Sequence, residues 1–454
     1  MSLAPAAKRT AIASQTILLG SAVGQMLLNI ALTSCLGRTL APSEYGFFTL
    51  VTTLLTMSRA VLDLGLSSAI AREIAQAPGR ELPLLRSMMG WHTYGGVALA
   101  SCTVAVALQE VELARRLVLY SAALVLAVSA PSGLLAAFQV RQAQFGLAML
   151  AFFGQAAVLV AVVAVRRMGP APIMVAALPI AREAVLQLGT IILSARLLGR
   201  WIIPDMRVAS VSRTFRQGAT YALAAILFQV HMHSGVTLVH VMRGDAELGA
   251  YAAAFRPLNF MMTLPWILTA PLVPIFATSA TTGTLRLREH VSAVGSVAMA
   301  IGAVAAMSGW ILAPSVIDLL YGGRYVGPEW ASIQVFRWLS VAFGAVCVSA
   351  VFATSLLAAR RERALVCVAA GALVLNIGLS VILIPQYGMV ATAIVFAATQ
   401  FLALVATGLL VTRHIGRFPV SPAISRALAF ALVAAIASSA IVPGAAAPPP
   451  LQSS

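Results

Sequence analysis

Four arginines lie inside long apolar runs of the sequence, where a charged side chain is costly. They are Arg59, Arg182, Arg256 and Arg337. A charge near the centre of a bilayer costs at least about 2.5–3.5 kcal/mol, so it needs a partner or a water-filled cavity. The arginine fork donates two parallel hydrogen bonds to phosphate or carboxylate groups. We therefore predict a site for a phosphorylated or acidic substrate, with Arg59 and Arg256 as main contacts and Arg182 as a third. Arg337 is expected to extend outward to the membrane interface.

Two acidic residues, Asp63 and Glu183, occur at similar depth and offer a structural alternative. Asp63 follows Arg59 by one helical turn, so the two side chains could neutralise each other. Glu183 is adjacent to Arg182, points in another direction and pairs with it less easily. Either acid is a candidate structural partner or a protonation site coupled to transport.

Two polar stripes with the same spacing occur in the first and the seventh apolar run. They are Gln25, Asn29 and Thr33, and, at one constant offset, Gln229, His233 and Thr237. The sequence leaves two interpretations of these stripes open. One is hydrogen bonding between helices. The other is the lining of a cavity by Gln25, Asn29, Gln229, His233 and Thr237. Shortly after each stripe, "SEYGFF" (43–48) resembles "AELGAY" (246–251). These similarities predict two related six-helix halves in parallel orientation. No set of side chains has metal-ligand spacing, and no metal or other cofactor is expected.

The composition places these residues in an all-α integral membrane protein. The chain has 454 residues, of which 60% are hydrophobic and only 10% charged, against about 25% charged in soluble domains. The net charge of +16 does not indicate nucleic-acid binding, because the basic residues are scattered among the apolar runs. Runs of spanning length recur with short gaps. We predict spans at 12–36, 45–70, 87–108, 114–138, 144–165, 171–195, 215–240, 248–277, 291–313, 331–358, 364–384, 388–412 and 423–442.

The basic residues also predict the orientation and the division of the chain. Most of them fall in alternate connections, which places the N-terminus in the cytoplasm by the positive-inside rule. The longest basic connection would link two lobes. The predicted order is an N-terminal six-helix lobe (1–195), a cytoplasmic linker (196–214), a C-terminal six-helix lobe (215–412), an additional helix (413–442) and a Pro-rich tail (443–454).

The stretches "LGRTLAPSEYGFFTLVTTLL" (36–55) and "LDLGLSSAIAREIA" (62–75) resemble the start of the bacterial polysaccharide flippases. These O-antigen-type transporters belong to the multidrug/oligosaccharidyl-lipid/polysaccharide (MOP) superfamily. Weaker similarities to the same family occur at "LLYGGRYVGPEW" (319–330) and "LIPQYGMVATAIVFA" (383–397). The resemblance implies two six-helix lobes around a central cavity, in the bacterial cytoplasmic (inner) membrane. It also implies alternating-access transport of undecaprenyl-diphosphate-linked oligosaccharide for surface lipopolysaccharide or exopolysaccharide. By helix and depth, Arg59 and Arg256 match the cationic cavity residues of related flippases.

The resemblance further implies coupling to H⁺ or Na⁺, and work alongside a polysaccharide polymerase and chain-length machinery. A cation-coupled multidrug or metabolite antiporter of the same fold is one alternative, although the first span carries no acid. A lipid II flippase is another. An enzyme, such as a membrane glycosyltransferase, is not expected, because the outer connections are short and poor in acids.

Overall fold

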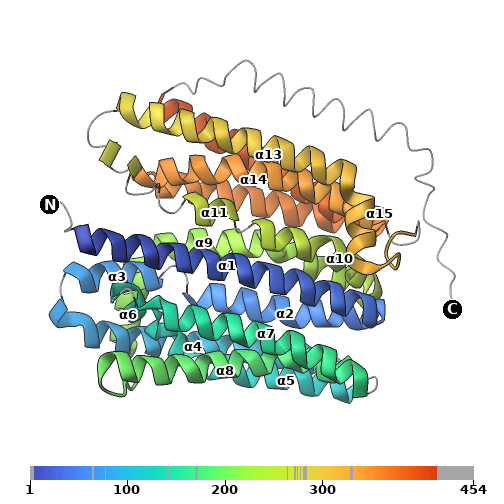
Figure 1. Cartoon of the computed structure of the whole chain (residues 1–454), viewed down its shortest axis with the longest axis horizontal. Coiled ribbons are helices and arrows are strands. Elements are labelled where there is room, and N and C mark those ends of the chain that lie inside the picture. The colour runs from blue at the N-terminus through green and yellow to red at the C-terminus, as the bar shows by residue number, and fades with distance from the viewer. Residues whose placement is uncertain are drawn as a thin grey trace. The chain divides into compact units, whose positions relative to one another are not determined.

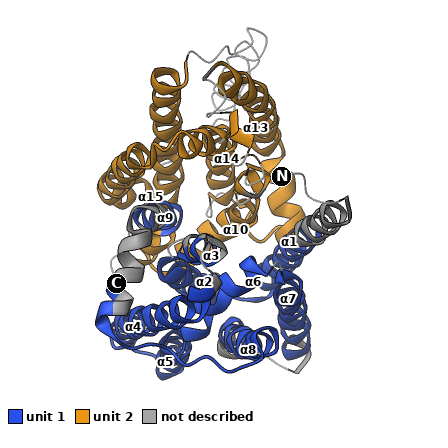
Figure 2. Cartoon of the chain, turned by 90° about the vertical axis from the view of Figure 1, so that its left-hand side faces the viewer, with its two compact units in different colours: residues 1–233 blue, residues 234–454 orange. Residues whose placement is uncertain are grey.

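The computed structural model describes residues 5–416, apart from short gaps at 64–65, 77, 142, 169–171, 263, 270–271, 273–274, 277, 280–283 and 328–330. Throughout these residues the regular structure is helical (Figure 1), which confirms the predicted all-α fold. The predicted final span (423–442) and the tail lie outside the described residues. The chain divides into two compact units, residues 1–233 and 234–454 (Figure 2). The predicted lobe boundaries remain a prediction.

Unit 1 contains eight α-helices before α9, together with two short 3₁₀ turns. They are α1 (Pro5–Thr39), α2 (Pro42–Asp63), α3 (Leu66–Gln76), η1 (Pro78–Arg80), α4 (Glu81–Ala107), α5 (Leu113–Ala127), η2 (Ala130–Leu134), α6 (Leu135–Val140), α7 (Gln144–Met168) and α8 (Pro172–Leu198). The described helices of unit 2 are α10 (Asp245–Met262), α11 (Leu264–Thr269), α13 (Thr284–Tyr321), α14 (Ser332–Ala358) and α15 (Glu362–His414). Helix α9 (Val208–Arg243) contains the boundary between the units.

Seven of the described helical segments are long and apolar enough to cross a membrane. They are Pro42–Asp63, Leu113–Val140, Gln144–Val165, Val175–Leu198, Leu285–Tyr321, Ser332–Ala358 and Glu362–His414. The predicted spans at 12–36, 87–108, 215–240 and 248–277 also lie on helices, namely α1, α4, α9 and α10–α11, outside this set of seven. These are the more polar helices. The number of crossings therefore stays a prediction.

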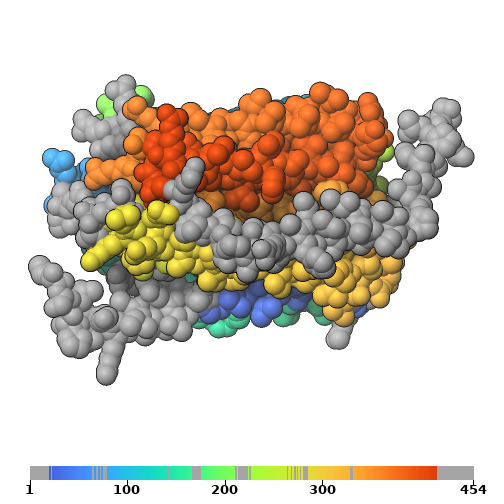
Figure 3. All heavy atoms as spheres, turned by 90° about the horizontal axis from the view of Figure 1, so that it is seen from above, coloured from blue at the N-terminus to red at the C-terminus, as the bar shows by residue number. Residues whose placement is uncertain are grey.

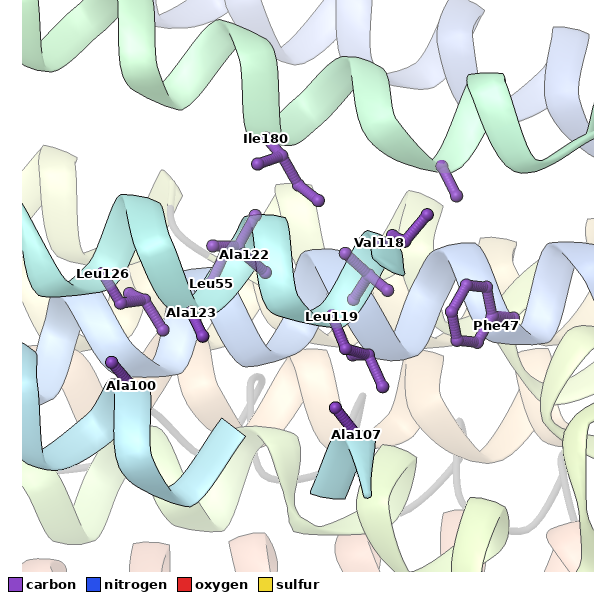
Figure 4. Packing of buried hydrophobic residues seen from close by; sticks show 12 residues of the cluster. Phe47, Leu55, Ala100, Ala107, Val118, Leu119, Ala122, Ala123, Leu126 and Ile180 are labelled. Carbon is purple, nitrogen blue, oxygen red and sulfur yellow. The ribbon is translucent and has the colours of Figure 1, made fainter. Parts of the chain in front are cut away.

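A core of small and branched side chains holds α2, α4, α5 and α8 together in unit 1. Phe47 and Leu55 of α2 pack with Leu119 and Ala122 of α5 and with Ile180 of α8 (Figure 4). All five are at most 5% exposed. Van der Waals packing rather than water exclusion must stabilise such contacts in a bilayer. This core fixes α2 and α8, the two helices that carry Arg59 and Glu183.

One predicted span of unit 1 is interrupted within the described residues. The run at 114–138 is divided among α5, η2 and α6, with Pro131 in the 3₁₀ turn. Proline cannot donate the backbone hydrogen bond of a continuing helix, which explains the interruption. The run at 45–70 lies on α2 and α3, on either side of residues 64–65.

Unit 2 is built around α14, which packs against α10, α13 and α15. Helices α13 and α14 approach closely at two glycines, since a Cβ added to Gly302 would lie 2.6 Å from the Gly344 carbonyl oxygen. Buried hydroxyls tie α10 to its neighbours: Tyr321 Oη donates to the Ala253 carbonyl at 2.8 Å, and Ser332 Oγ to that of Ala250 at 2.9 Å.

Helix α15 is two helices joined by a reversal rather than one rod. Its 53 residues would extend about 80 Å if straight. Gly388 interrupts it with φ 61° and ψ −150°, a conformation essentially restricted to glycine. Asn376 Nδ2 donates to Thr399 Oγ1 at 3.2 Å, although a straight helix would separate these residues by about 35 Å. The two halves therefore lie side by side, as the predicted spans 364–384 and 388–412 require.

The outer side of α15 is apolar and exposed. Val374, Ile382 and Leu409 are 61–70% exposed, and residues of this helix, orange to red, form much of the face in Figure 3. An exposed apolar face on a helix of spanning length is what contact with lipid requires.

Candidate functional site

An ion pair between α2 and α8 is the centre of the polar cluster in unit 1. Arg59 Nη1 lies 3.0 Å from Glu183 Oε2. The Glu183 side chain is only 6% exposed, whereas that of Arg59 is 43% exposed. A buried carboxylate without a partner is strongly destabilising, so Arg59 neutralises Glu183. Within the part of the chain that the structure describes, Glu183 is the one hydrogen-bond partner of the Arg59 side chain. The rest of the guanidinium is open to a ligand.

Asp63 does not pair with Arg59, so the pairing along one helix face that the spacing allows is not formed. Asp63 ends α2, and its Oδ1 accepts a hydrogen bond from Ser67 Oγ in the first turn of α3. This bond joins the last residue of α2 to the first turn of α3. Asp63 thus has a local partner, whereas Glu183 is the acid that pairs with Arg59.

Arg182 adds a second cation to the cluster. Its charge acts on both Glu183 and Arg59, and its Nε is buried without a hydrogen-bond partner. The side chain lies along α7, where a Cβ added to Gly154 would be 3.6 Å from Arg182 Cγ. Two guanidinium groups therefore share one buried carboxylate, which leaves the cluster with one excess positive charge. Such a cluster favours an anionic ligand.

The first polar stripe joins α1 to α7. Gln155 Nε2 donates to Asn29 Oδ1 at 2.9 Å, and Asn29 Nδ2 donates to the Gln25 carbonyl at 2.8 Å. Asn29 is thus engaged in a bond between helices, while Gln25 contributes its backbone and has a half-buried side chain. Sequence reasoning missed Gln155. The available signal was its position as a lone amide in the middle of the apolar run 144–165.

The second stripe is divided between buried and exposed positions on α9. His233 is buried, Gln229 half-buried and Thr237 exposed. The neighbouring Ser234 Oγ, in unit 2, donates to Asn376 Oδ1 at 2.9 Å, and Asn376 continues to Thr399. This buried chain of bonds joins α9 to both halves of α15. The lining of a cavity by Gln229, His233 and Thr237 stays a prediction.

The remaining two arginines of the spans lie in unit 2. Arg256 is half-buried on α10, directly before Pro257 within the helix. Arg337 of α14 donates from Nε to the Trp310 carbonyl at 3.2 Å, and its guanidinium lies 5.6 Å from the Trp310 ring centroid. These contacts join Arg337 to α13, and its extension outward to the membrane interface stays a prediction. Arg256 remains a candidate for substrate contact.

The architecture is similar to that of solved membrane transporters. The lipid II flippase MurJ, in an inward closed conformation, is similar with a TM-score of 0.73 and 10% identity, over 94% of this chain and 92% of that one. An inward-facing MATE multidrug transporter of the MOP superfamily is similar with a TM-score of 0.61 and 14% identity, over 91% of this chain and 99% of that one. A MOP superfamily transporter from Pyrococcus furiosus is similar with a TM-score of 0.57 and 14% identity, over 88% of this chain and 96% of that one. The chain therefore has the MOP transporter fold.

The family follows from the sequence itself. A family model described as "Polysaccharide biosynthesis protein" matches residues 35–328, and the chain belongs to this family. The predicted resemblance to the polysaccharide transporters is confirmed. A comparison with curated protein sequences found no match. The protein is thus a multi-pass membrane protein of the polysaccharide biosynthesis family.

Proposed function

We propose that this protein is a flippase for undecaprenyl-diphosphate-linked oligosaccharide repeat units. It would move them from the cytoplasmic to the outer leaflet of the bacterial inner membrane, with its N-terminus in the cytoplasm. The observation that carries the proposal is the excess positive charge of the Arg59–Arg182–Glu183 cluster in a chain of the polysaccharide biosynthesis family. A diphosphate is an anion whose oxygens fit the arginine fork.

The same cluster argues against a cation-coupled multidrug antiporter. Such a transporter needs a carboxylate at depth that is available to a cation or a proton. Here Glu183 is committed to Arg59, and Asp63 accepts a bond from Ser67. A cationic drug would meet two guanidinium groups and a carboxylate that is already neutralised. Like charges in a medium of low dielectric repel strongly.

Each candidate residue then has a proposed task. Arg59 and Arg256 contact the diphosphate or acidic sugar groups, and Arg182 supplies the unpaired charge beside them. Gln25, Asn29, Gln229, His233 and Thr237 line the path of the sugars. Transport proceeds by alternating access, and Glu183 and Asp63 serve as structural acids through their contacts with Arg59 and Ser67. The chain itself carries out transport rather than catalysis and works beside a polymerase and chain-length machinery.

A lipid II flippase is the second candidate, favoured by the likeness in fold to MurJ. Both substrates carry a diphosphate, so the arginine cluster suits either one. Deletion distinguishes them. A strain that survives, loses surface polysaccharide and accumulates lipid-linked repeat units in mass spectra supports the polysaccharide flippase. Loss of viability with accumulation of lipid II supports the second candidate.

A set of three variants tests the role of Arg59 within that assay. Arg59→Gln leaves Glu183 buried without its hydrogen-bonded cation, at a cost of about 1–3 kcal/mol or more for the lost partner. Its effect on export alone is therefore ambiguous. Arg59→Gln combined with Glu183→Gln removes both charges and restores a neutral contact. Arg59→Lys keeps the charge but loses the fork.

The double variant distinguishes substrate binding by Arg59 from simple neutralisation of Glu183. If Arg59 binds substrate, the double variant reaches the wild-type protein level and still accumulates lipid-linked repeat units. If Arg59 serves only to neutralise Glu183, the double variant restores both protein level and export. That second result would remove Arg59 from the proposed site.

A further inference from the structure

The connection between α8 and α9, residues 199–207, is bound along α4 by its backbone. The Asp205 amide donates to the Arg86 carbonyl at 2.9 Å, and Arg86 Nε donates to the Ile203 carbonyl at 3.1 Å. Tyr94 Oη donates to the Met206 carbonyl at 2.8 Å. Three hydrogen bonds over four residues fix the course of the connection. Its side chains are consequently presented in a defined direction.

Several of these side chains are large, apolar and turned outward. Trp201 and Ile203 are 69% and 70% exposed and Met206 is 43% exposed, and Val208 at the start of α9 is 71% exposed. Because the backbone is held by α4, these side chains cannot withdraw by moving the connection. An apolar patch with an exposed tryptophan at the end of membrane-spanning helices is typical of the lipid–water interface.

Beside Trp201 is a small apolar pocket of about 190 Å³. Met89 of α4, Leu134 of η2 and Ile191 of α8 contribute to its wall. Ser194 is the one polar residue among its ten lining residues, and its Oγ already donates to the Ile191 carbonyl at 2.8 Å. The pocket is below the roughly 300–1,000 Å³ of sites for whole small molecules. It suits a segment of an acyl chain.

Several basic side chains lie beside the pocket and the exposed apolar side chains. Arg196, Arg200 and Arg207 are exposed, and no described residue forms an ion pair with any of them. Arg196 and Arg200 directly flank Ala195 and Trp201, which line the pocket. Arg86 and Arg141 add two more cations by bonding to the connection and its approach.

The nearby acids do not balance these arginines. Glu81 is paired with Arg141 at 3.0 Å. Asp205 Oδ1 accepts the Arg207 amide at 3.1 Å. The surface therefore has an excess of positive charge beside the end of the membrane-length segment Val175–Leu198.

We propose that residues 196–207 and the adjoining pocket form a binding site for an anionic glycerophospholipid. The headgroup phosphate pairs with Arg196 and Arg200, and one acyl chain enters the pocket behind Trp201. Charge complementarity selects an anionic lipid over a zwitterionic one. This site is separate from the cluster at Arg59 and does not depend on the proposed transport function.

Quenching of Trp201 fluorescence by brominated lipid tests the site directly. The full-length protein is reconstituted into phosphatidylcholine vesicles that contain an equal fraction of brominated phosphatidylglycerol or brominated phosphatidylcholine. The difference between wild type and Trp201→Phe isolates the signal of Trp201 from the other five tryptophans. Each basic residue near an anionic surface strengthens association about fivefold. We expect at least that preference for the anionic lipid.

Two triple variants provide the comparison. Arg196→Gln/Arg200→Gln/Arg207→Gln should abolish the preference. The control removes the same number of exposed arginines from another predicted cytoplasmic connection (Arg360, Arg361 and Arg363, each to Gln) and should retain it.

Three results would overturn the proposal. One is equal quenching by both brominated lipids in the wild-type protein, which would mean only general lipid contact. Another is a preference that survives the first triple variant. The third is relief of quenching by undecaprenyl phosphate but not by excess unbrominated phosphatidylglycerol, which would assign the pocket to the polyprenyl lipid instead.

Discussion

Replacing Gly388 with alanine should destabilise unit 2, and the size of the effect follows from two contacts. A Cβ at this position would lie 2.5 Å from Glu247 Oε1. Glu247 cannot easily withdraw, because it accepts the Met389 amide at 2.6 Å and the Arg243 Nε at 2.7 Å. The φ of 61° and ψ of −150° are moreover unfavourable for any residue with a side chain.

The backbone strain and the displacement of Glu247 both lower the free energy of unfolding. Backbone strain of this kind costs about 1–3 kcal/mol. Displacing the Glu247 carboxylate from the first amide of the second half-helix costs about another 1–3 kcal/mol. The expected loss in the free energy of unfolding is therefore at least about 2 kcal/mol, or roughly thirtyfold in the unfolding equilibrium constant.

The sign of the change in the free energy of unfolding tests whether α15 reverses at Gly388. If α15 were one continuous helix, Gly388→Ala would stabilise it by about 1 kcal/mol, the ordinary difference in helix propensity. The matched controls are Gly371→Ala and Gly378→Ala in the same helix, where no other atom lies within 4 Å of the added Cβ. Both should be neutral or slightly stabilising.

Reversible unfolding of the purified protein in mixed detergent micelles, followed by tryptophan fluorescence, gives the three free energies on one scale. A Gly388→Ala variant as stable as the Gly371→Ala control would refute the reversal at Gly388. In a Glu247→Ala background the bond to the Met389 amide is already lost, so adding Gly388→Ala there measures the backbone strain alone and separates the two contributions.

Two further predictions concern contacts between helices. Gly302→Val should separate α13 from α14, because the added Cβ would lie 2.6 Å from the Gly344 carbonyl oxygen, and should destabilise the protein by about 1–3 kcal/mol. Gly371→Val, at an open position, serves as the control in the same unfolding assay, and equal stability of the two would contradict the packing. Asn29→Leu and Gln155→Leu should show a coupling of about 0.5–1.5 kcal/mol in a double-mutant cycle, whereas strict additivity would mean that their 2.9 Å bond contributes nothing.

Much of the fold could be predicted because the physics of spanning a membrane acts locally. Twenty apolar residues in sequence are enough to indicate a helix, whatever the rest of the chain does. The interruption in the turn at Pro131 was missed, because a run of apolar residues continues across it. The reversal at Gly388 agrees with the predicted spans 364–384 and 388–412, and proline and glycine occur together there in "IPQYGM".

The partners within the site could not be predicted in the same way. Sequence spacing shows only the neighbours one turn away, and it offered Asp63 as the partner of Arg59. The actual partner, Glu183, is 124 residues distant and comes near only because α2 and α8 share a core. Sequence spacing did predict that Arg182 pairs less easily with Glu183, because adjacent residues on a helix point apart.

The internal repeat inferred from the polar stripes has a counterpart in the contacts of each unit. In unit 1 a side-chain amide bond joins α1 to α7, the first and fifth predicted spans, through Asn29 and Gln155. In unit 2 the seventh and eleventh predicted spans are joined through Ser234 and Asn376. The bonding residue of α9 is Ser234 rather than His233, one position from the aligned stripe.

Both aligned glutamates accept a backbone amide, but from different places. Glu44 accepts the Ala41 amide at 2.8 Å, three residues before it at the start of α2. Glu247, in the first turn of α10, accepts the Met389 amide at the reversal of α15. Glu44 therefore acts at the start of its own helix, whereas Glu247 links two helices, and the division into two related halves stays a prediction. The cationic cluster of Arg59 and Arg182 with Glu183 lies in unit 1, and it supplies the positive charge that the proposed anionic substrate requires.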